Sequence, residues 1–198
     1  MRIGLLGGTF DPPHIGHLIV AQDAWSALKL DRVVFVPAAV PPHKAGRVEA
    51  SAELRLEMLR AACGDDPRFA IDDLELRRPG PSYSVDTVRE YRHRYPEATL
   101  YLLIGVDQYT QFDTWREPDT IRSMATVVVL SRSGEPARPS GAGADVGLEV
   151  TRIDVSATEI RRRVAAGEPI RYLVPDGVRS IIEREGLYRA GVPARPSV

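Results

Sequence analysis

The sequence is poor in cysteine and has no long hydrophobic run. Cys63 is the single cysteine among 198 residues, so an intrachain disulfide and a zinc site of several thiolates are both excluded. Glycines and Pro12 interrupt the first apolar run, and no stretch approaches the roughly 20 apolar residues of a membrane span. We therefore expect a cytoplasmic protein, in a reducing compartment, with no membrane partner.

The chain also has no large excess of positive or negative charge. The 26 Lys and Arg residues nearly balance 27 Asp and Glu, which gives a net charge of −1. No overall positive field would attract nucleic acid, so any anion site must be local. Hydrophobic residues make up 43% and charged residues 27% of the chain, which is typical of a globular protein rather than a disordered one. The length fits a single domain, 1–198.

Short apolar runs alternate with segments of helical pattern. The runs expected to be strands are 3–6, 32–36, 69–71, 100–104, 126–130 and 148–153. One helix is expected to begin near Gly16, and another after Ser51, which would cap it. A third should follow Ser82, with Val85, Val88 and Tyr91 facing inward. Two more are expected over 156–166 and 176–185. The segment 133–147 is rich in Gly, Ala, Pro and Ser and is expected to be a loop.

Several of the expected strands are apolar on both faces. This pattern, with helices between the strands, indicates an α/β fold with a parallel sheet that is covered by helices. Ligands of such sheets bind beyond the carboxyl ends of the strands. Chemistry is therefore expected just after the strands, that is, after Leu6, Val36, Ile104 and Ile153.

A polar motif, GGTFDPPHIGH, occupies residues 7–17 between the first strand and the first helix. Its glycines allow backbone amides to approach a ligand closely, and a helix N-terminus presents N–H groups and a positive dipole end. His14 and His17 can both donate hydrogen bonds to phosphate oxygens. Nucleotidyl transfer needs such donors where charge builds up, and a purely structural glycine turn is the weaker alternative for so complete a motif.

The same spacing excludes other nucleotide-binding motifs. It is neither G-x-G-x-x-G nor G-x-x-x-x-G-K-[ST], so a bound dinucleotide cofactor and a P-loop are unsupported. A zinc site at His14 and His17 is also unsupported, because the chain has four histidines and no third ligand is evident. We expect no metal site made by the protein alone.

A second motif, VSATEIR, occupies residues 155–161. Ser156 and Glu159 have the spacing of a helix capping box. Thr158 and Arg161 are three residues apart, so they share a face of the first helical turns and can form an anion cradle. The two roles are compatible, because a capped helix N-terminus can also bind phosphate.

A third motif, Gly105-Val106-Asp107, directly follows the expected central strand. Asp107 can accept hydrogen bonds from ribose hydroxyls, or it can cap a short helix. Trp115 comes eight residues later and can present its indole face to a flat aromatic ligand, or pack in the core.

Together these motifs resemble the nucleotidylyltransferase superfamily, in which H-x-G-H recurs. The fuller form G-G-T-F-D-P-x-H-x-G-H is similar to the nicotinate-nucleotide adenylyltransferase branch, and the resemblance runs from Arg2 to about Arg189. It implies a Rossmann-like doubly wound parallel sheet, with 155–190 as a small C-terminal helical subdomain. It also implies direct in-line attack on the α-phosphorus of ATP.

For the ATP side, the resemblance implies that His14 and His17 contact the phosphates. Gly8, Thr9 and Phe10 would line the same pocket. Asp11 we expect to hold the turn through its side chain rather than to act in catalysis.

The remaining ATP contacts come from later motifs. The second motif is similar to I-S-S-T-x-I-R, which binds the triphosphate, so Ser156 and Thr158 would bind ATP and Arg161 would stabilise the leaving pyrophosphate. Ala157 replaces the usual serine and removes one hydroxyl contact. Lys44, in a P-P-H-K segment, would approach the phosphates. Gly105 and Asp107 would lie near the ribose.

For the nicotinate mononucleotide side, the resemblance implies that Trp115 stacks on the pyridine ring. A backbone amide just after this tryptophan holds the nicotinate carboxylate in the family, and this chain has Arg116 and Glu117 there, without an aromatic residue. Ser84, where threonine is more usual, would touch the mononucleotide, and Arg132 would bind its phosphate. A helix cap at Ser84 and a surface charge at Arg132 are the alternatives.

The implied reaction joins nicotinate mononucleotide to AMP from ATP, giving nicotinate adenine dinucleotide and pyrophosphate in NAD biosynthesis. Mg²⁺ would bridge phosphate oxygens, and the protein would act on small molecules as a monomer or homodimer. Alternative acceptors are nicotinamide mononucleotide and phosphopantetheine, and a cytidylyltransferase is a weaker alternative. A non-catalytic nucleotide-binding sensor belongs to another class, and the four intact polar residues His14, His17, Lys44 and Arg161 argue against it.

Overall fold

The computed structural model of the chain describes residues 1–39, 48–132 and 145–189. Within these residues, six strands form one sheet in which every neighbouring pair is parallel. The strands are β1 Arg2–Gly8, β2 Arg32–Pro37, β3 Phe69–Ile71, β4 Thr99–Gly105, β5 Thr126–Arg132 and β6 Val146–Val150. The parallel sheet that the apolar pattern predicts is confirmed, because the central strands are buried along most of their length.

The strand order places β1 and β4 side by side at the centre. The order is β3-β2-β1-β4-β5-β6, so the chain moves outward from β1 to β3 and then returns to continue from β4 to β6. This is the doubly wound Rossmann order, whose switch point lies where the direction reverses. Gly8 ends β1 and Gly105 ends β4, so the glycine motifs lie at the carboxyl edge of the switch point.

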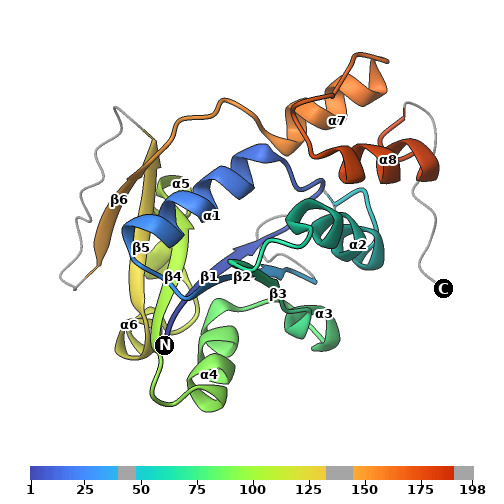
Figure 1. Cartoon of the computed structure of the whole chain (residues 1–198). Coiled ribbons are helices and arrows are strands. Elements are labelled where there is room, and N and C mark those ends of the chain that lie inside the picture. The colour runs from blue at the N-terminus through green and yellow to red at the C-terminus, as the bar shows by residue number, and fades with distance from the viewer. Residues whose placement is uncertain (40–47, 133–144, 190–198) are drawn as a thin grey trace.

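Helices cover both faces of the sheet (Figure 1). α1 (Ile15–Ala27) and α2 (Ala52–Cys63) cover one face, and α3 (Leu74–Arg77), α4 (Ser84–Arg94) and α6 (Pro118–Met124) cover the other. The positions expected to face inward on α4 are Val85, Val88 and Tyr91, and all three are buried. Burial of these apolar surfaces is the main favourable term that holds the layers together.

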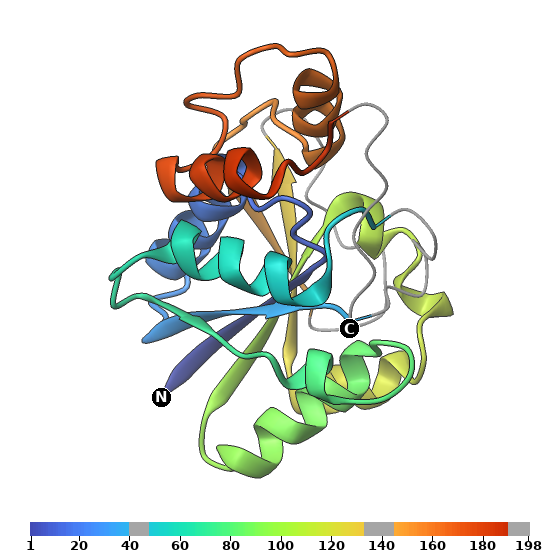
Figure 2. The same ribbon diagram turned by 90° about the vertical axis from the view of Figure 1, so that its right-hand side faces the viewer.

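The last two helices, α7 (Ala157–Ala165) and α8 (Asp176–Glu185), lie at one end of the molecule, with α8 against α2 (Figure 2). Ile160, Val178 and Ile182 form a separate core there with Met58 of α2. The same part of the chain reaches α1, because the Ile15 N–H donates to the Leu173 carbonyl at 3.1 Å. The C-terminal helices are therefore anchored next to the first motif.

One strand expected from the sequence begins and ends earlier than expected. The apolar run 148–153 predicts a strand, but β6 spans Val146–Val150, with Val146 opposite Val128 of β5. Pairing with a buried neighbour extends the strand into a sequence whose own pattern does not mark it. The remainder of the expected loop, 133–144, lies outside the described residues.

Several short helices are not predicted by the sequence pattern. They are α3, α5 (Val106–Tyr109), the 3₁₀ turn η1 (Phe112–Thr114) and α6. Each contains only three to seven residues, which is too short for a helical periodicity to be recognised. Among the described residues, no helix is both long enough and apolar enough to cross a membrane.

Candidate active site

A cavity of about 240 Å³ opens at the carboxyl edge of β1 and β4. Three separated segments supply most of its walls: residues 7–9 at the end of β1, 82–84 at the start of α4, and 114–116 at the end of η1. Leu102, Leu103 and Ile104 of β4 also line it. The cavity therefore lies at the switch point, where ligands of doubly wound sheets bind.

Trp115 lines this cavity and also packs against the protein. Its ring centroid lies 5.2 Å from that of Phe112, and the side chain is half-buried. The two roles that the sequence leaves open for Trp115 are thus compatible, since one part of the indole contacts the core and another part borders the cavity. An indole that borders a cavity with mostly apolar walls can present its face to a flat aromatic ring.

Ser84 lines the cavity as the first residue of α4. The N-cap position of this helix is Tyr83, and Ser84 does not cap it. The alternative role that the sequence suggests for Ser84, as a helix cap, is therefore wrong. Ser84 borders the cavity instead.

Glu75 of α3 is a charged residue of the cavity wall that sequence analysis missed. Its carboxylate accepts a hydrogen bond from Thr87 Oγ1 at 2.6 Å and is 7% exposed. Burial raises the pKa of the Glu75 carboxyl, and the hydroxyls of Thr87 and Ser82 oppose that rise. Ser82 Oγ also accepts from the Ala39 N–H at 2.9 Å, so Glu75 belongs to a polar chain that ties α4 to the end of β2.

The two motif histidines form a compact pair at the N-terminus of α1. The His14 N–H donates to His17 Nδ1 at 3.1 Å, and the rings stack with centroids 3.7 Å apart. Because Nδ1 of His17 accepts this bond, its ring proton is assigned to Nε2. A Cβ at Gly16 would lie 3.0 Å from His14 Nδ1, so the glycine between the histidines leaves room for the pair.

Gly8 and Thr9 line the cavity, but Phe10 does not. Phe10 is buried, with φ of 51°, and its ring meets His17 edge-on at 5.0 Å and Phe35 at 5.8 Å. A Cβ at Gly8 would lie 2.8 Å from the Phe10 ring. Phe10 therefore packs beneath the motif and supports it, and its expected contribution to the ATP pocket stays a prediction.

Asp11 connects the first motif to distant parts of the chain. Its buried carboxylate accepts from the Glu49 N–H at 2.7 Å, the Ala50 N–H at 3.1 Å and the Tyr188 hydroxyl at 2.7 Å. Burial, and then the neighbouring Asp11 carboxylate, raise the pKa of Tyr188 far above its usual range. The expectation that Asp11 holds its own local turn is therefore wrong, since it joins three segments that are far apart in sequence.

Arg161 of α7 joins the same network. Its Nη1 donates to the Asp11 carbonyl at 2.8 Å, and its Nε lies 2.8 Å from Glu49 Oε1. The guanidinium is thus close to the histidine motif, as its expected role requires. In this structure its charge is paired with the exposed Glu49 carboxylate.

Arg55 of α2 is a second residue that sequence analysis missed. It is 1% exposed and donates to the carbonyls of Thr9 and Ala38, both at 2.8 Å. Burial lowers the pKa of Arg55, although nearby Asp11 opposes the change. A sequence signal existed, because Arg55 interrupts the apolar stripe of Met58, Leu59 and Ala62 at helical spacing.

The second motif only half forms the expected capping box. Ser156 Oγ accepts from the Glu159 N–H at 3.2 Å and caps α7. The Glu159 carboxylate instead accepts from Arg162 and Arg163, both at 2.8 Å, because these partners lie one turn along the same helix. The prediction of a full capping box is therefore wrong. Ser156 and Thr158 are exposed at the start of the helix.

The other expected site residues lie as follows. Gly105 is the N-cap of α5, so Asp107, which is exposed on its first turn, does not cap this helix. The next residue, Gln108, lines the cavity. Arg132 is the last residue of β5, opposite Val150. Lys44 lies outside the described residues.

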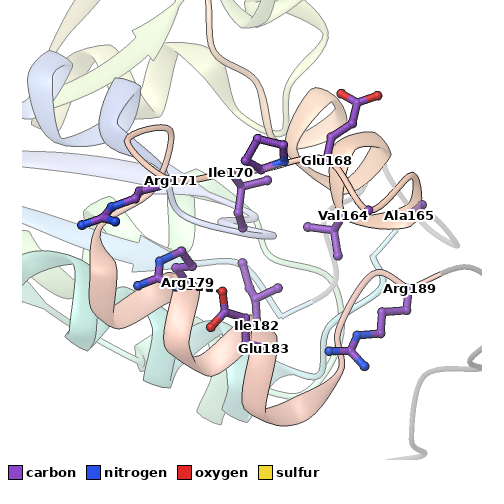
Figure 3. A pocket seen from close by; sticks show the side chains of 11 residues that line it. Val164, Ala165, Glu168, Ile170, Arg171, Arg179, Ile182, Glu183 and Arg189 are labelled. Carbon is purple, nitrogen blue, oxygen red and sulfur yellow. Dashed lines mark hydrogen bonds and ion pairs between the residues drawn. The ribbon is translucent and has the colours of Figure 1, made fainter.

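A larger cavity of about 610 Å³ lies between α7 and α8, and no residue of the segment 7–17 lines it (Figure 3). Val164, Ile170 and Ile182 form its apolar wall, and an ion pair of 2.8 Å joins Arg179 and Glu183 beside it. None of the site residues expected from the sequence is among those that line it. Size alone therefore does not identify the functional site.

No group of three or more His, Cys, Asp or Glu side chains within residues 1–39, 48–132 and 145–189 is arranged to hold a metal ion. The histidines stack on each other, and Asp11 is occupied by three hydrogen-bond donors.

A family model described as cytidylyltransferase-like matches residues 5–163. Curated relatives match over nearly the full length. A protein of Thermus thermophilus named "Probable nicotinate-nucleotide adenylyltransferase" is 48% identical over 189 residues, which cover 96% of this chain and 100% of that protein. A protein of Exiguobacterium sibiricum with the same name is 44% identical, covering 95% of this chain and 99% of that protein.

Solved structures share the fold. The Plasmodium falciparum nicotinic acid mononucleotide adenylyltransferase complexed with NaAD has a TM-score of 0.77 at 16% identity, covering 94% of this chain and 97% of that one. The same protein complexed with APC has a TM-score of 0.75 at 15% identity, covering 94% and 96%. At such identities the similarity is one of fold.

Proposed function

The chain belongs to the cytidylyltransferase-like family and, within it, to the nicotinate-nucleotide adenylyltransferases, and from this premise we propose that it joins nicotinate mononucleotide to the AMP part of ATP. The products are nicotinate adenine dinucleotide and pyrophosphate, so the enzyme serves NAD biosynthesis. The relatives' full-length similarity supports this activity.

One observation carries the proposal. Trp115 and Ser84, on separate segments, border the same cavity as Gly8 and Thr9 of the histidine motif. The wall that we propose to bind the ring therefore adjoins, at the switch point, the motif that we propose to bind phosphate. A transferase that joins a pyridine nucleotide to AMP needs both in this relation, because its two substrates must meet at one phosphorus.

The reaction requires no covalent intermediate with the protein. An oxygen of the nicotinate mononucleotide phosphate attacks the α-phosphorus of ATP, and the bond from that phosphorus to the bridging oxygen of pyrophosphate breaks. The attacking phosphate is already anionic near neutral pH, so no strong general base is needed. Catalysis then consists of positioning the substrates and neutralising the charge that develops.

On the phosphate side, His14 and His17 would donate to phosphate oxygens at the N-terminus of α1. Ser156 and Thr158 would add the N-terminus of α7, and Lys44 would approach from the segment after β2. Arg161 would stabilise the leaving pyrophosphate. Its pairing with exposed Glu49 supports this role, because an incoming phosphate can replace a solvated carboxylate at modest cost.

On the nucleoside sides, Gly105 and Asp107 would lie near the ribose of ATP. Trp115 would stack on the pyridine ring, and Ser84 would contact the same mononucleotide. Arg132, at the end of β5, would bind its phosphate. The cavity volume of about 240 Å³ supports entry of a single aromatic ring at this wall.

Nucleotidyltransferases of this family act with a divalent metal and ATP, and we propose Mg²⁺. The ion would enter on the ATP phosphates and supply charge neutralisation there. We further propose one domain over 1–198 with 155–190 as a helical subdomain, acting in the cytoplasm as a monomer or homodimer on these two small molecules.

The test is pyrophosphate release from ATP and Mg²⁺ with three acceptors assayed separately: nicotinate mononucleotide, nicotinamide mononucleotide and phosphopantetheine. We expect strong turnover with the nicotinate form. Turnover with only another acceptor would keep the chemistry and change the substrate. ATP binding without pyrophosphate release would favour a nucleotide sensor instead.

A further inference from the structure

We propose that the side chain of Arg116 reads the carboxylate of the pyridine nucleotide and thereby makes the enzyme select the acid over the amide. This inference rests on the proposed function and specifies the substrate class of the same site. The family resemblance assigns the carboxylate to a backbone amide after the tryptophan, and the cavity here adds a cationic side chain at that place.

Arg116 follows Trp115 and lines the same cavity. Its guanidinium lies over the ring of Tyr83, 5.0 Å from the ring centroid, and Tyr83 is another residue of the cavity wall. Stacking on an aromatic face orients the planar guanidinium. The Arg116 cation is therefore held at the border of the cavity, next to Trp115.

The charge of Arg116 is only weakly matched by the protein. Its closest carboxylate in the described chain is Glu117, with Nε to Oε1 at 3.7 Å. Glu117 is bound more closely by Arg89 of α4 and also accepts from Thr120 Oγ1. Arg89 is the main cause that lowers the pKa of Glu117, and Arg116 contributes least. Arg116 thus retains donors and charge for a ligand.

A second charge makes the cavity asymmetric. The Glu75 carboxylate lines the same space and is fixed by Thr87. A ligand carboxylate is attracted by Arg116 and not by Glu75, so the two side chains give it one favoured orientation. Arginine can also donate two parallel hydrogen bonds to a carboxylate, whereas a carboxamide offers one oxygen and a donor NH₂ that faces the arginine unfavourably.

The experiment compares kcat/KM for nicotinate mononucleotide and nicotinamide mononucleotide, at saturating ATP and Mg²⁺, in wild type and variants. Arg116→Gln should lower the acid-to-amide ratio about 10-fold, as expected for losing a partly exposed hydrogen bond to a charged group, and mainly through KM for the acid. Arg116→Lys should lose less, because it keeps the charge without the fork.

Arg171→Gln is the matched control. Arg171 also lies over a tyrosine ring, Tyr172 at 5.3 Å, and is exposed, but it borders the cavity between α7 and α8. The variant Arg171→Gln changes the net charge by as much as Arg116→Gln does, and it should leave the acid-to-amide ratio unchanged. An unchanged ratio in folded Arg116→Gln, or a wild-type ratio near one, would overturn the inference. Absence of wild-type turnover with both pyridine nucleotides would instead overturn the proposed function.

Discussion

The phosphate side of the proposed site and the pyridine side are built in different ways. The phosphate side centres on one continuous segment, 11–17, whose Asp11 accepts buried or partly buried hydrogen bonds from Glu49, Ala50 and Tyr188. The pyridine side gathers short pieces around Trp115, with mostly apolar walls and two opposite charges. Charge neutralisation demands donors that are fixed in advance, whereas a flat ring can be held by walls whose rim residues vary.

The largest expected effect comes from breaking the phosphate side at Asp11. Asp11→Ala leaves three buried or partly buried donors without their acceptor, so the free energy of unfolding should fall by about 3–5 kcal/mol. Urea unfolding measures this loss. Tyr188→Phe removes only one of these bonds and should cost about 1 kcal/mol. A loss in Asp11→Ala no greater than in Tyr188→Phe would show that Asp11 does not join the segments.

The next largest expected effect is a loss of turnover when a histidine on the phosphate side is removed. His17→Ala should lower turnover by about 10² or more, by analogy with the loss of one preorganised donor. Its KM for nicotinate mononucleotide should stay close to wild type, because the pyridine side is separate. Steady-state pyrophosphate release measures both.

His93→Ala is the control for His17→Ala, since His93 is exposed on α4. It should leave turnover unchanged. Near-normal turnover in His17→Ala that melts like wild type would refute the role of this histidine.

The smallest effect sharpens the pyridine side. Burial raises the folded-state pKa of Glu75, so its contribution to stability is greatest below its unfolded pKa and declines as pH rises through the folded value. The neighbouring charges are Arg78, which lowers this pKa, and Asp86, which raises it. Glu75→Gln removes the titration, so its Tm relative to wild type should increase from pH 4 to pH 8 by a few degrees at most.

Thermal unfolding over that pH range, without ligand, checks the Glu75 prediction. Glu57→Gln serves as a control, because Glu57 is exposed and pairs with Arg184 across the α2–α8 contact. A constant Tm difference between Glu75→Gln and wild type would mean that the buried carboxyl does not titrate differently in the folded state.

The parallel sheet could be predicted from the sequence alone, and the sequence also predicts where its chemistry lies. Apolar runs on both strand faces can only be buried between helix layers, and glycines with two histidines at a strand-to-helix junction predict a phosphate site without knowledge of contacts. The resemblance to the family predicts that Trp115 and Ser84 belong to the same site. In the structure both residues line one cavity.

The contacts that hold these parts together could be seen only in the folded chain. Asp11 is hydrogen-bonded to Tyr188, and Arg55 to the carbonyls of Thr9 and Ala38. Glu75 is hydrogen-bonded to Thr87. No local pattern specifies such partners, because each bond forms between segments whose distance depends on how all the layers pack. A buried polar group must find its partner wherever the fold brings one, so its role becomes visible only when the chain is folded.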